Sequence, residues 1–222
     1  MHKSYVIRTG RFTPAQRKAC DTLAENIIIP FSEEILDFNK IFQTESKTTA
    51  NPIMEIGFGS GFATAEIAQA NPGKNYLGIE VHRPGIGRLL REIKERNLSN
   101  IRIIEHDAAD VVQKMIPPDS LDGIHLFFPD PWPKKRHHKR RLVQRPFTET
   151  LADSLKQNGY LYMVTDWEDY ALHALEELNA TAGLHNAYEK FAPPQSWRPV
   201  TRFEQKGLTK GHVIREIYFI RN

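Results

Sequence analysis

Residues 52–61, PIMEIGFGSG, join a short apolar run to a glycine-rich turn. The run at 52–57 predicts a buried strand, and SGFATAEIAQAN at 60–71 predicts a helix. Glycines between a strand and a helix allow a tight turn and a close approach of a ligand to the backbone at the helix N-terminus. The stretch therefore predicts the first strand–turn–helix unit of a sheet that binds a ligand beyond its strand ends.

Strands and helices alternate along the rest of the chain. Such alternation indicates a parallel sheet covered by helices on both faces, which is the α/β class with a Rossmann-like arrangement. The segments at 43–51 and 193–211 are predicted to be loops, and residues 1–13 a mobile basic arm. We expect further strands at 75–81, 101–105, 122–129, 159–165 and 213–220, and helices at 14–26, 83–97, 142–157 and 168–180.

Composition limits the class of protein. The 222 residues suit one domain or one domain with an extension, and 40% hydrophobic with 26% charged residues is ordinary for a globular chain. No apolar run approaches the ~20 residues of a membrane span. The lone Cys20 excludes an internal disulfide, so we expect a reducing, cytoplasmic location. Zinc-ligand spacing is absent, so no metal is expected.

Acidic residues follow the next two predicted strands. Glu80 ends the strand NYLGIEV, where a carboxylate can accept hydrogen bonds from both ribose hydroxyls. Asp107 follows IRIIEH, where it can accept from an adenine amino group or cap the segment after it. Phe62 stands where the dinucleotide fingerprint needs glycine, which disfavours a pyrophosphate cradle and a nicotinamide dehydrogenase.

This pattern resembles the class I S-adenosylmethionine-dependent methyltransferases. The resemblance implies a seven-stranded, mostly parallel sheet with an antiparallel late strand and helices on both faces. It also implies that the glycine loop approaches the methionine moiety, with Glu55 near the methionyl end. Residues 41–222 would form this methyltransferase domain, after a basic arm and helix at 1–40.

The stretch after the fourth predicted strand is more specific. FPDPWPKKRHHKRR, residues 128–141, strongly resembles the motif of the tRNA (guanine-N7-)-methyltransferases, the bacterial TrmB family. The EIGFGSG loop and the segments at 80–82, 106–108, 165–167 and 198–204 agree with this family, so the resemblance covers about residues 50 to 220. Arg202 replaces the family's usual lysine, which keeps the charge but changes the geometry.

The resemblance implies methyl transfer from S-adenosylmethionine to N7 of a guanine in tRNA, at position 46 in the variable loop. It implies no membrane and no obligate protein partner. Carried over by position, it assigns Glu55, Gly57, Gly59, Glu80, Asp107 and Asp130 to the cofactor, with Asp130 also catalytic; Lys134, Asp166, Thr201, Arg202, Phe203 and Glu204 to the guanine; and Arg136, His137, His138, Lys139, Arg140 and Arg141 to the RNA.

The chemistry of methyl transfer to guanine N7 explains why a carboxylate would be placed at position 130. Guanine N7 has an in-plane lone pair and no proton, so the site must mainly align the reacting atoms and tolerate positive charge on the ring. We therefore expect Asp130 to orient the base and stabilise charge rather than to act as a base. The basic run beside it would hold phosphates while the base leaves its stack. Trp132 or Trp167 either stacks on that base or packs in the core.

Two other functions remain open from the sequence. Exocyclic-amine methyltransferases carry Asn/Asp-Pro-Pro-aromatic after strand four, but Asp130 and Trp132 are separated by one proline only. An RNA-binding protein with an inactive cofactor fold is the other alternative, and the intact acids and glycine loop argue against it. Asp166 has a rival interpretation as a helix N-cap.

Overall fold

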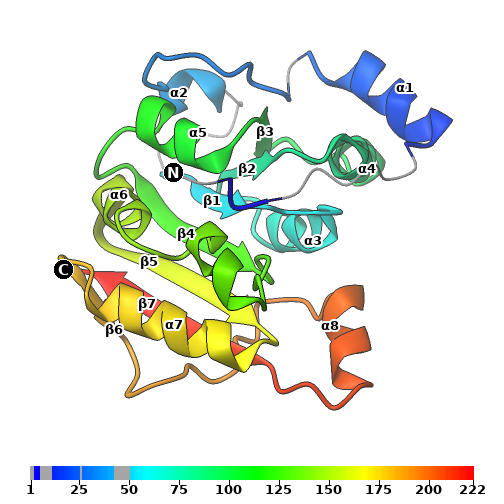
Figure 1. Ribbon diagram of the computed structural model, residues 1–222. Helices are drawn as coiled ribbons and strands as arrows, with labels where there is room; N and C mark the ends of the chain where they lie inside the picture. The colour runs from blue at the N-terminus through cyan, green and yellow to red at the C-terminus, as the bar shows by residue number, and fades with distance from the viewer. Residues whose placement is uncertain (1–2, 6–11, 26, 43–50) are drawn as a thin grey trace. The chain divides into compact units, whose positions relative to one another are not determined.

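The computed structural model describes residues 3–5, 12–25, 27–42 and 51–222. Within this part of the chain, seven strands form one mixed sheet in the order β3-β2-β1-β4-β5-β7-β6 (Figure 1). None of its helices is long and apolar enough to cross a lipid bilayer. The strand order confirms the expected Rossmann-like α/β fold. The expected loop at 43–51 and arm at 1–13 lie mostly outside the described residues.

Packing divides the chain into two compact units, which are described separately: Ile7–Pro117, and Pro118–Asn222 with Met1–Val6. The first unit carries three parallel strands whose side chains are almost all buried, because each is a short apolar run. Helices α3 and α4 pack against one face of these strands, α1 packs on α4, and α5 lies on the other face (Figure 1). The elements are α1 (Pro14–Leu23), α2 (Phe38–Ile41), β1 (Ile53–Ile56), α3 (Phe62–Ala70), β2 (Tyr76–Glu80), α4 (Arg83–Glu95), β3 (Ile101–Glu105) and α5 (Ala108–Met115).

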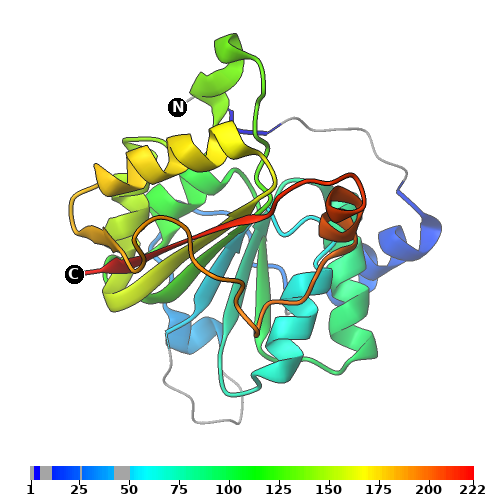
Figure 2. The same ribbon diagram turned by 90° about the horizontal axis from the view of Figure 1, so that it is seen from below.

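The second unit pairs β4 with β5 in parallel and β5 with β7 in antiparallel fashion, which confirms the expected late strand. Helices α6 and α7 pack against β5, and the short 3-10 helix η1 stands out beyond α7 (Figure 2). The elements are β4 (Leu121–Phe127), η1 (Lys135–Arg140), α6 (Phe147–Ser154), β5 (Leu155–Thr165), α7 (Glu168–Asn179), β6 (Leu184–Asn186), α8 (Arg202–Leu208) and β7 (Arg215–Arg221).

Several predicted boundaries were wrong. The helix expected at 142–157 begins only at Phe147, after Pro146 at its N-cap, and residues 155–158 already belong to β5. The strand expected at 122–129 ends at Phe127, because Phe128 turns into the left-handed region with φ 52°. The loop expected at 193–211 contains α8. Elements α2, α5, η1 and β6 were not expected at all.

Candidate active site

The glycine loop of the first unit follows β1. Gly57, Gly59 and Gly61 have φ of 73°, 56° and 70°, a region that favours glycine. A Cβ added to Gly61 would lie 2.5 Å from the Leu89 side chain, so this glycine is needed for packing. A Cβ on Gly57 or Gly59 would meet no protein atom within 4 Å. The backbone at these two positions therefore faces open space that a ligand can fill.

Glu80 ties this loop to the end of β2. Its Oε2 accepts from the Gly59 amide at 2.8 Å, and its Oε1 accepts from the Val81 and His82 amides at 2.7 and 3.0 Å. The residue is only 8% exposed. A carboxylate oxygen has two lone pairs, so Oε2 keeps one for a hydroxyl donor. The sequence did not show that Glu80 also shapes the glycine loop.

Glu55 is buried one residue before the end of β1. The Thr64 hydroxyl of α3 donates to its Oε2 at 2.7 Å. The pKa of Glu55 is raised to about 7, chiefly by burial; the hydrogen bond from Thr64 opposes this rise and the nearby Glu80 adds to it. A ligand that brings a positive charge to this carboxylate would favour its ionised form.

Asp107 performs the capping role that the sequence left open. Its Oδ1 accepts from the Ala109 amide at 2.9 Å, and it is the N-cap of α5. The side chain is half-buried, so capping does not remove it from a ligand. Glu55, Glu80 and Asp107 thus follow or end three neighbouring parallel strands of one unit, as the sequence predicted.

The acids and glycines of the first unit fit S-adenosylmethionine. The open glycine backbone suits the methionine end, where Glu55 can balance an ammonium group. Glu80 and Asp107 offer acceptors for hydroxyl and amino groups farther along the strand ends. Among the described residues, no three His, Cys, Asp or Glu side chains gather as metal ligands.

In the second unit, Asp130 lies exposed on a stiff turn after β4. Phe128 and Trp132, on either side of it, have φ of 52° and 46°, and this left-handed conformation costs L-residues roughly 1–2 kcal/mol each. The turn is held by surrounding contacts. The Trp132 indole donates to the Ser4 carbonyl at 3.0 Å, and the Arg140 guanidinium lies 5.0 Å from its ring. Trp132 is therefore a packing residue of this loop.

Arg141 corrects one expectation. Its side chain is 1% exposed, so it does not offer its guanidinium to RNA as the rest of the basic run can. It donates to the Pro131 carbonyl at 3.1 Å, pairs with Asp169 at the start of α7, and lies 5.0 Å from the Tyr170 ring. Arg141 thus links the Asp130 turn to the first turn of α7.

The basic run itself is otherwise open to solvent. Lys134, Lys135, Arg136 and Lys139 are exposed, and Arg140 is half-buried against Trp132. His137 has a lowered pKa because of partial burial and the neighbouring cations, Arg136 first. It is therefore uncharged at neutral pH. His138 lies near Arg141 and Asp169.

One of the residues expected to contact guanine, Phe203, lies against the same turn. The Phe203 ring, 58% exposed, lies 5.1 Å from the Phe128 ring, so α8 reaches the residue two positions before Asp130. Asp166 follows β5 and pairs with the His212 imidazole at 2.7 Å. Arg202 is exposed, and Thr201 caps α8. Neither Phe128 nor His212 was predicted from the sequence to belong to the site.

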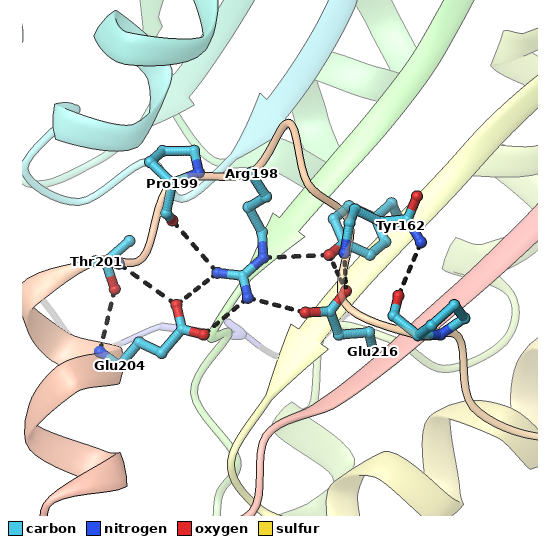
Figure 3. A network of polar contacts seen from close by, with 8 residues as sticks. Tyr162, Arg198, Pro199, Thr201, Glu204 and Glu216 are labelled. Carbon is cyan, nitrogen blue, oxygen red and sulfur yellow. Dashed lines mark hydrogen bonds and ion pairs between the residues drawn. The ribbon is translucent and has the colours of Figure 1, made fainter.

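Glu204 corrects a second expectation, because it points inward rather than toward a substrate. It is 4% exposed, and the Arg198 guanidinium binds both of its oxygens, at 2.5 and 2.8 Å (Figure 3). It also completes a capping box with Thr201. The pattern Thr-x-x-Glu was visible in the sequence and is the signal that could have predicted both α8 and this role.

Comparisons with known proteins identify the fold and the family of this chain. A family model described as "Putative methyltransferase" matches residues 49–217. Solved structures share the fold at low identity: a 16S rRNA methyltransferase, KamB (TM-score 0.61, 12% identity, 85% of this chain and 95% of that chain), and the antibiotic-resistance methyltransferase Kmr (0.55, 13%, 84% and 94%).

Curated relatives match almost the whole chain. Three of them are the tRNA (guanine-N(7)-)-methyltransferases of Nitrosomonas europaea (51% identical, 99% of this chain and 96% of the relative), Nitrosospira multiformis (49%, 98% and 93%) and Paraburkholderia xenovorans (49%, 98% and 82%). Identity at this level over such coverage shows common family membership. The chain belongs to the tRNA (guanine-N7-)-methyltransferase family.

Proposed function

We propose that this protein transfers a methyl group from S-adenosylmethionine to N7 of a guanine in tRNA, the variable-loop guanine at position 46. The observation that carries the proposal is the grouping of Asp130 with two aromatic side chains in the second unit. An exposed carboxylate, Asp130, lies on a braced turn that contacts the α8 segment through Phe128 and Phe203. Family membership supplies the class of reaction, and this grouping supplies a place for a planar base.

The first unit holds the methyl donor in this proposal. When bound, S-adenosylmethionine supplies an electrophilic methyl group on a sulfonium. Gly57 and Gly59 let its methionine part approach the backbone, Glu55 balances its ammonium group, and Glu80 and Asp107 accept hydrogen bonds from its ribose and adenine. The ionised form of Glu55 is then favoured despite its burial.

Asp130 acts on the guanine. Its exposed oxygens can accept hydrogen bonds from the guanine N1–H and exocyclic amine, which orients N7. Its negative charge stabilises the positive charge that grows on the ring as N7 bonds to carbon and the carbon–sulfur bond breaks. N7 carries no proton, so Asp130 removes none. Asp166 adds polar contacts to the base or its ribose, and Lys134 binds the phosphate of the same nucleotide.

Exposed cations of the basic run hold the tRNA. Lys134, Lys135, Arg136, Lys139 and the half-buried Arg140 are free of the buried ion pairs described above and can bind phosphates on either side of the extruded guanine. Extrusion costs a few kcal/mol, which several phosphate contacts offset. A cytoplasmic location follows from such a substrate, and the mechanism needs no metal ion.

Transfer of labelled methyl to bulk tRNA that lacks N7-methylguanosine tests the proposal. We expect label on tRNA, mapped by chemical cleavage at N7-methylguanosine, and a strong loss of transfer for Asp130→Ala. Glu189→Ala removes another exposed carboxylate and serves as the matched control. Label on an exocyclic amine would instead support an amine methyltransferase. Binding of donor and tRNA without transfer would support an RNA-binding protein.

A further inference from the structure

Arg198 is a buried arginine in the loop before α8, and no role has been assigned to it above. It is 9% exposed. Its Nε donates to the Tyr162 hydroxyl at 3.1 Å, and Nη2 donates to Glu216 at 2.9 Å in addition to the two bonds to Glu204 (Figure 3). One guanidinium thus satisfies a phenol and two carboxylates in a planar fork that only arginine offers.

The partners of Arg198 come from three elements. Tyr162 lies on β5, Glu216 on β7 and Glu204 on α8. The Tyr162 hydroxyl also donates to Glu216, and the Gln195 amide donates to Glu216 at 3.1 Å, which fixes the loop leading to α8. Arg198 is therefore the polar link between α8 and two central strands of its unit.

Helix α8 has little else to hold its orientation. It is seven residues long, and its buried residues are Glu204 and Gly207, so it has no buried apolar side chain. Phe203 and Leu208 are 58% and 44% exposed. Short helices without apolar burial depend on specific contacts rather than on intrinsic propensity. The bidentate bond from Arg198 to Glu204 is the contact of this kind that the structure shows.

We propose that Arg198 is a positioning residue for guanine binding. By fixing Glu204, it sets the start of α8 so that Phe203 lies against Phe128, two residues before Asp130. Glu204 then acts through this link and not by touching the base. The inference rests on the proposed function of the same site and assigns it a further residue.

Arg198→Lys keeps one positive charge but cannot bind both oxygens of Glu204 and also reach Tyr162 and Glu216. We expect kcat to fall about tenfold to hundredfold at saturating tRNA, with a change in KM for tRNA of less than about threefold, since phosphate contacts supply most of the affinity. The dissociation constant for S-adenosylmethionine should not change, because the side-chain partners of Arg198 are Tyr162, Glu204 and Glu216, none of which is expected to bind the donor. Hydrogen exchange at α8 amides should accelerate selectively.

Arg215→Lys is the matched control. Arg215 lies on β7 of this unit and also pairs with a carboxylate, Glu168, at 2.7 Å, and within the described part of the chain its side chain contacts Glu168, Val213 and Phe191 rather than α8. We expect it to leave kcat unchanged. Glu204→Gln is the second variant, and it should reproduce the Arg198→Lys phenotype. The double variant should be no worse than either single one, because both remove the same link.

Full kcat in Arg198→Lys would overturn the inference, as would a loss of kcat accompanied by an equal loss of donor binding and thermal stability. If Arg198→Lys fails to fold, Glu204→Gln decides by the same criteria. The wild-type protein separates this failure from failure of the proposed function. If it does not methylate tRNA, the function is wrong, whereas wild-type transfer with full activity in both variants refutes the positioning role alone.

Discussion

The basic run makes a quantitative prediction about salt dependence, because not all of its cations can reach RNA. Six residues between Lys134 and Arg141 are Lys or Arg. Arg141 is buried and paired with Asp169, so it brings no free charge to a phosphate. Lys134, Lys135, Arg136, Lys139 and Arg140 remain. His137 adds no charge at neutral pH, since burial and its cationic neighbours lower its pKa.

The magnitude follows from counterion release. For single strands, each phosphate contact contributes about −0.7 to the slope of log affinity against log salt concentration. Five contacts therefore give a slope of about −3.5, and six would give about −4.2. The affinity should thus fall about 100-fold between roughly 50 and 200 mM salt. Lys139→Ala should reduce the slope to about −2.8. Arg141→Ala should leave the slope at about −3.5, because its charge is already neutralised inside the protein.

Fluorescence anisotropy of labelled tRNA across this salt range, at about pH 8 where free imidazoles are neutral, measures the slope. Turnover supplies the second readout. Arg141→Ala should lower kcat about tenfold or more, because the Pro131 carbonyl next to Asp130 loses its donor, while Lys139→Ala should keep kcat at saturating tRNA. Equal reductions of the slope by the two variants would refute the reasoning, since Arg141 would then be bound to phosphate.

Three further predictions concern the expected donor site in the first unit and Asp130 in the second unit. Glu55→Gln should remove a pH dependence of stability. The folded pKa of about 7 exceeds the ordinary 4.5, so the free energy of unfolding of the ligand-free wild type should fall by about 2.5 kcal/mol as pH rises from about 5 to about 8, which thermal or denaturant unfolding at both pH values can measure. Gly59→Ala should weaken S-adenosylmethionine binding, measured by calorimetry, at least about tenfold at a stability cost of about 1 kcal/mol. Gly61→Ala should instead lower the melting temperature, because its Cβ meets the Leu89 side chain. Equal donor affinity in Gly59→Ala and wild type would contradict the inference that a ligand fills the space at Gly59. Asp130→Asn should lower kcat about tenfold to hundredfold, and near-full turnover would exclude a role for its charge.

The sequence predicted the first unit well because each of its signals is local. Apolar runs marked β1 to β3, glycines marked the turn, and Glu80 and Asp107 were placed by their distance from the strand ends. Residues adjacent to a strand end inherit their place from the sheet, so no long-range contact had to be guessed. The resemblance to a family added the chemistry of these positions.

The second unit was harder because its decisive contacts are long-range. No periodicity distinguishes Arg141 from Arg140 in a run of cations, yet one is buried and the other half-exposed. The inward turn of Glu204 depends on Arg198 and on Glu216 from a later strand. Only α8 left a local signal, the Thr-x-x-Glu capping pattern, and the glycine and proline content around it favoured a loop instead.

The buried and exposed cations of this protein therefore have different consequences for the reaction. Arg141 and Arg198 are buried and paired with carboxylates, and each holds a segment of the proposed guanine site, the Asp130 turn or α8. A buried ion pair contributes little net stability compared with apolar packing, but removal of one partner leaves an uncompensated charge, so such pairs are suited to fixing geometry. Exposed lysines contribute affinity that salt weakens. Substitutions of the buried arginines should change kcat at any salt concentration, whereas substitutions of the exposed lysines should change tRNA affinity most at low salt. Measuring kcat and tRNA affinity of each variant across one salt series distinguishes the two.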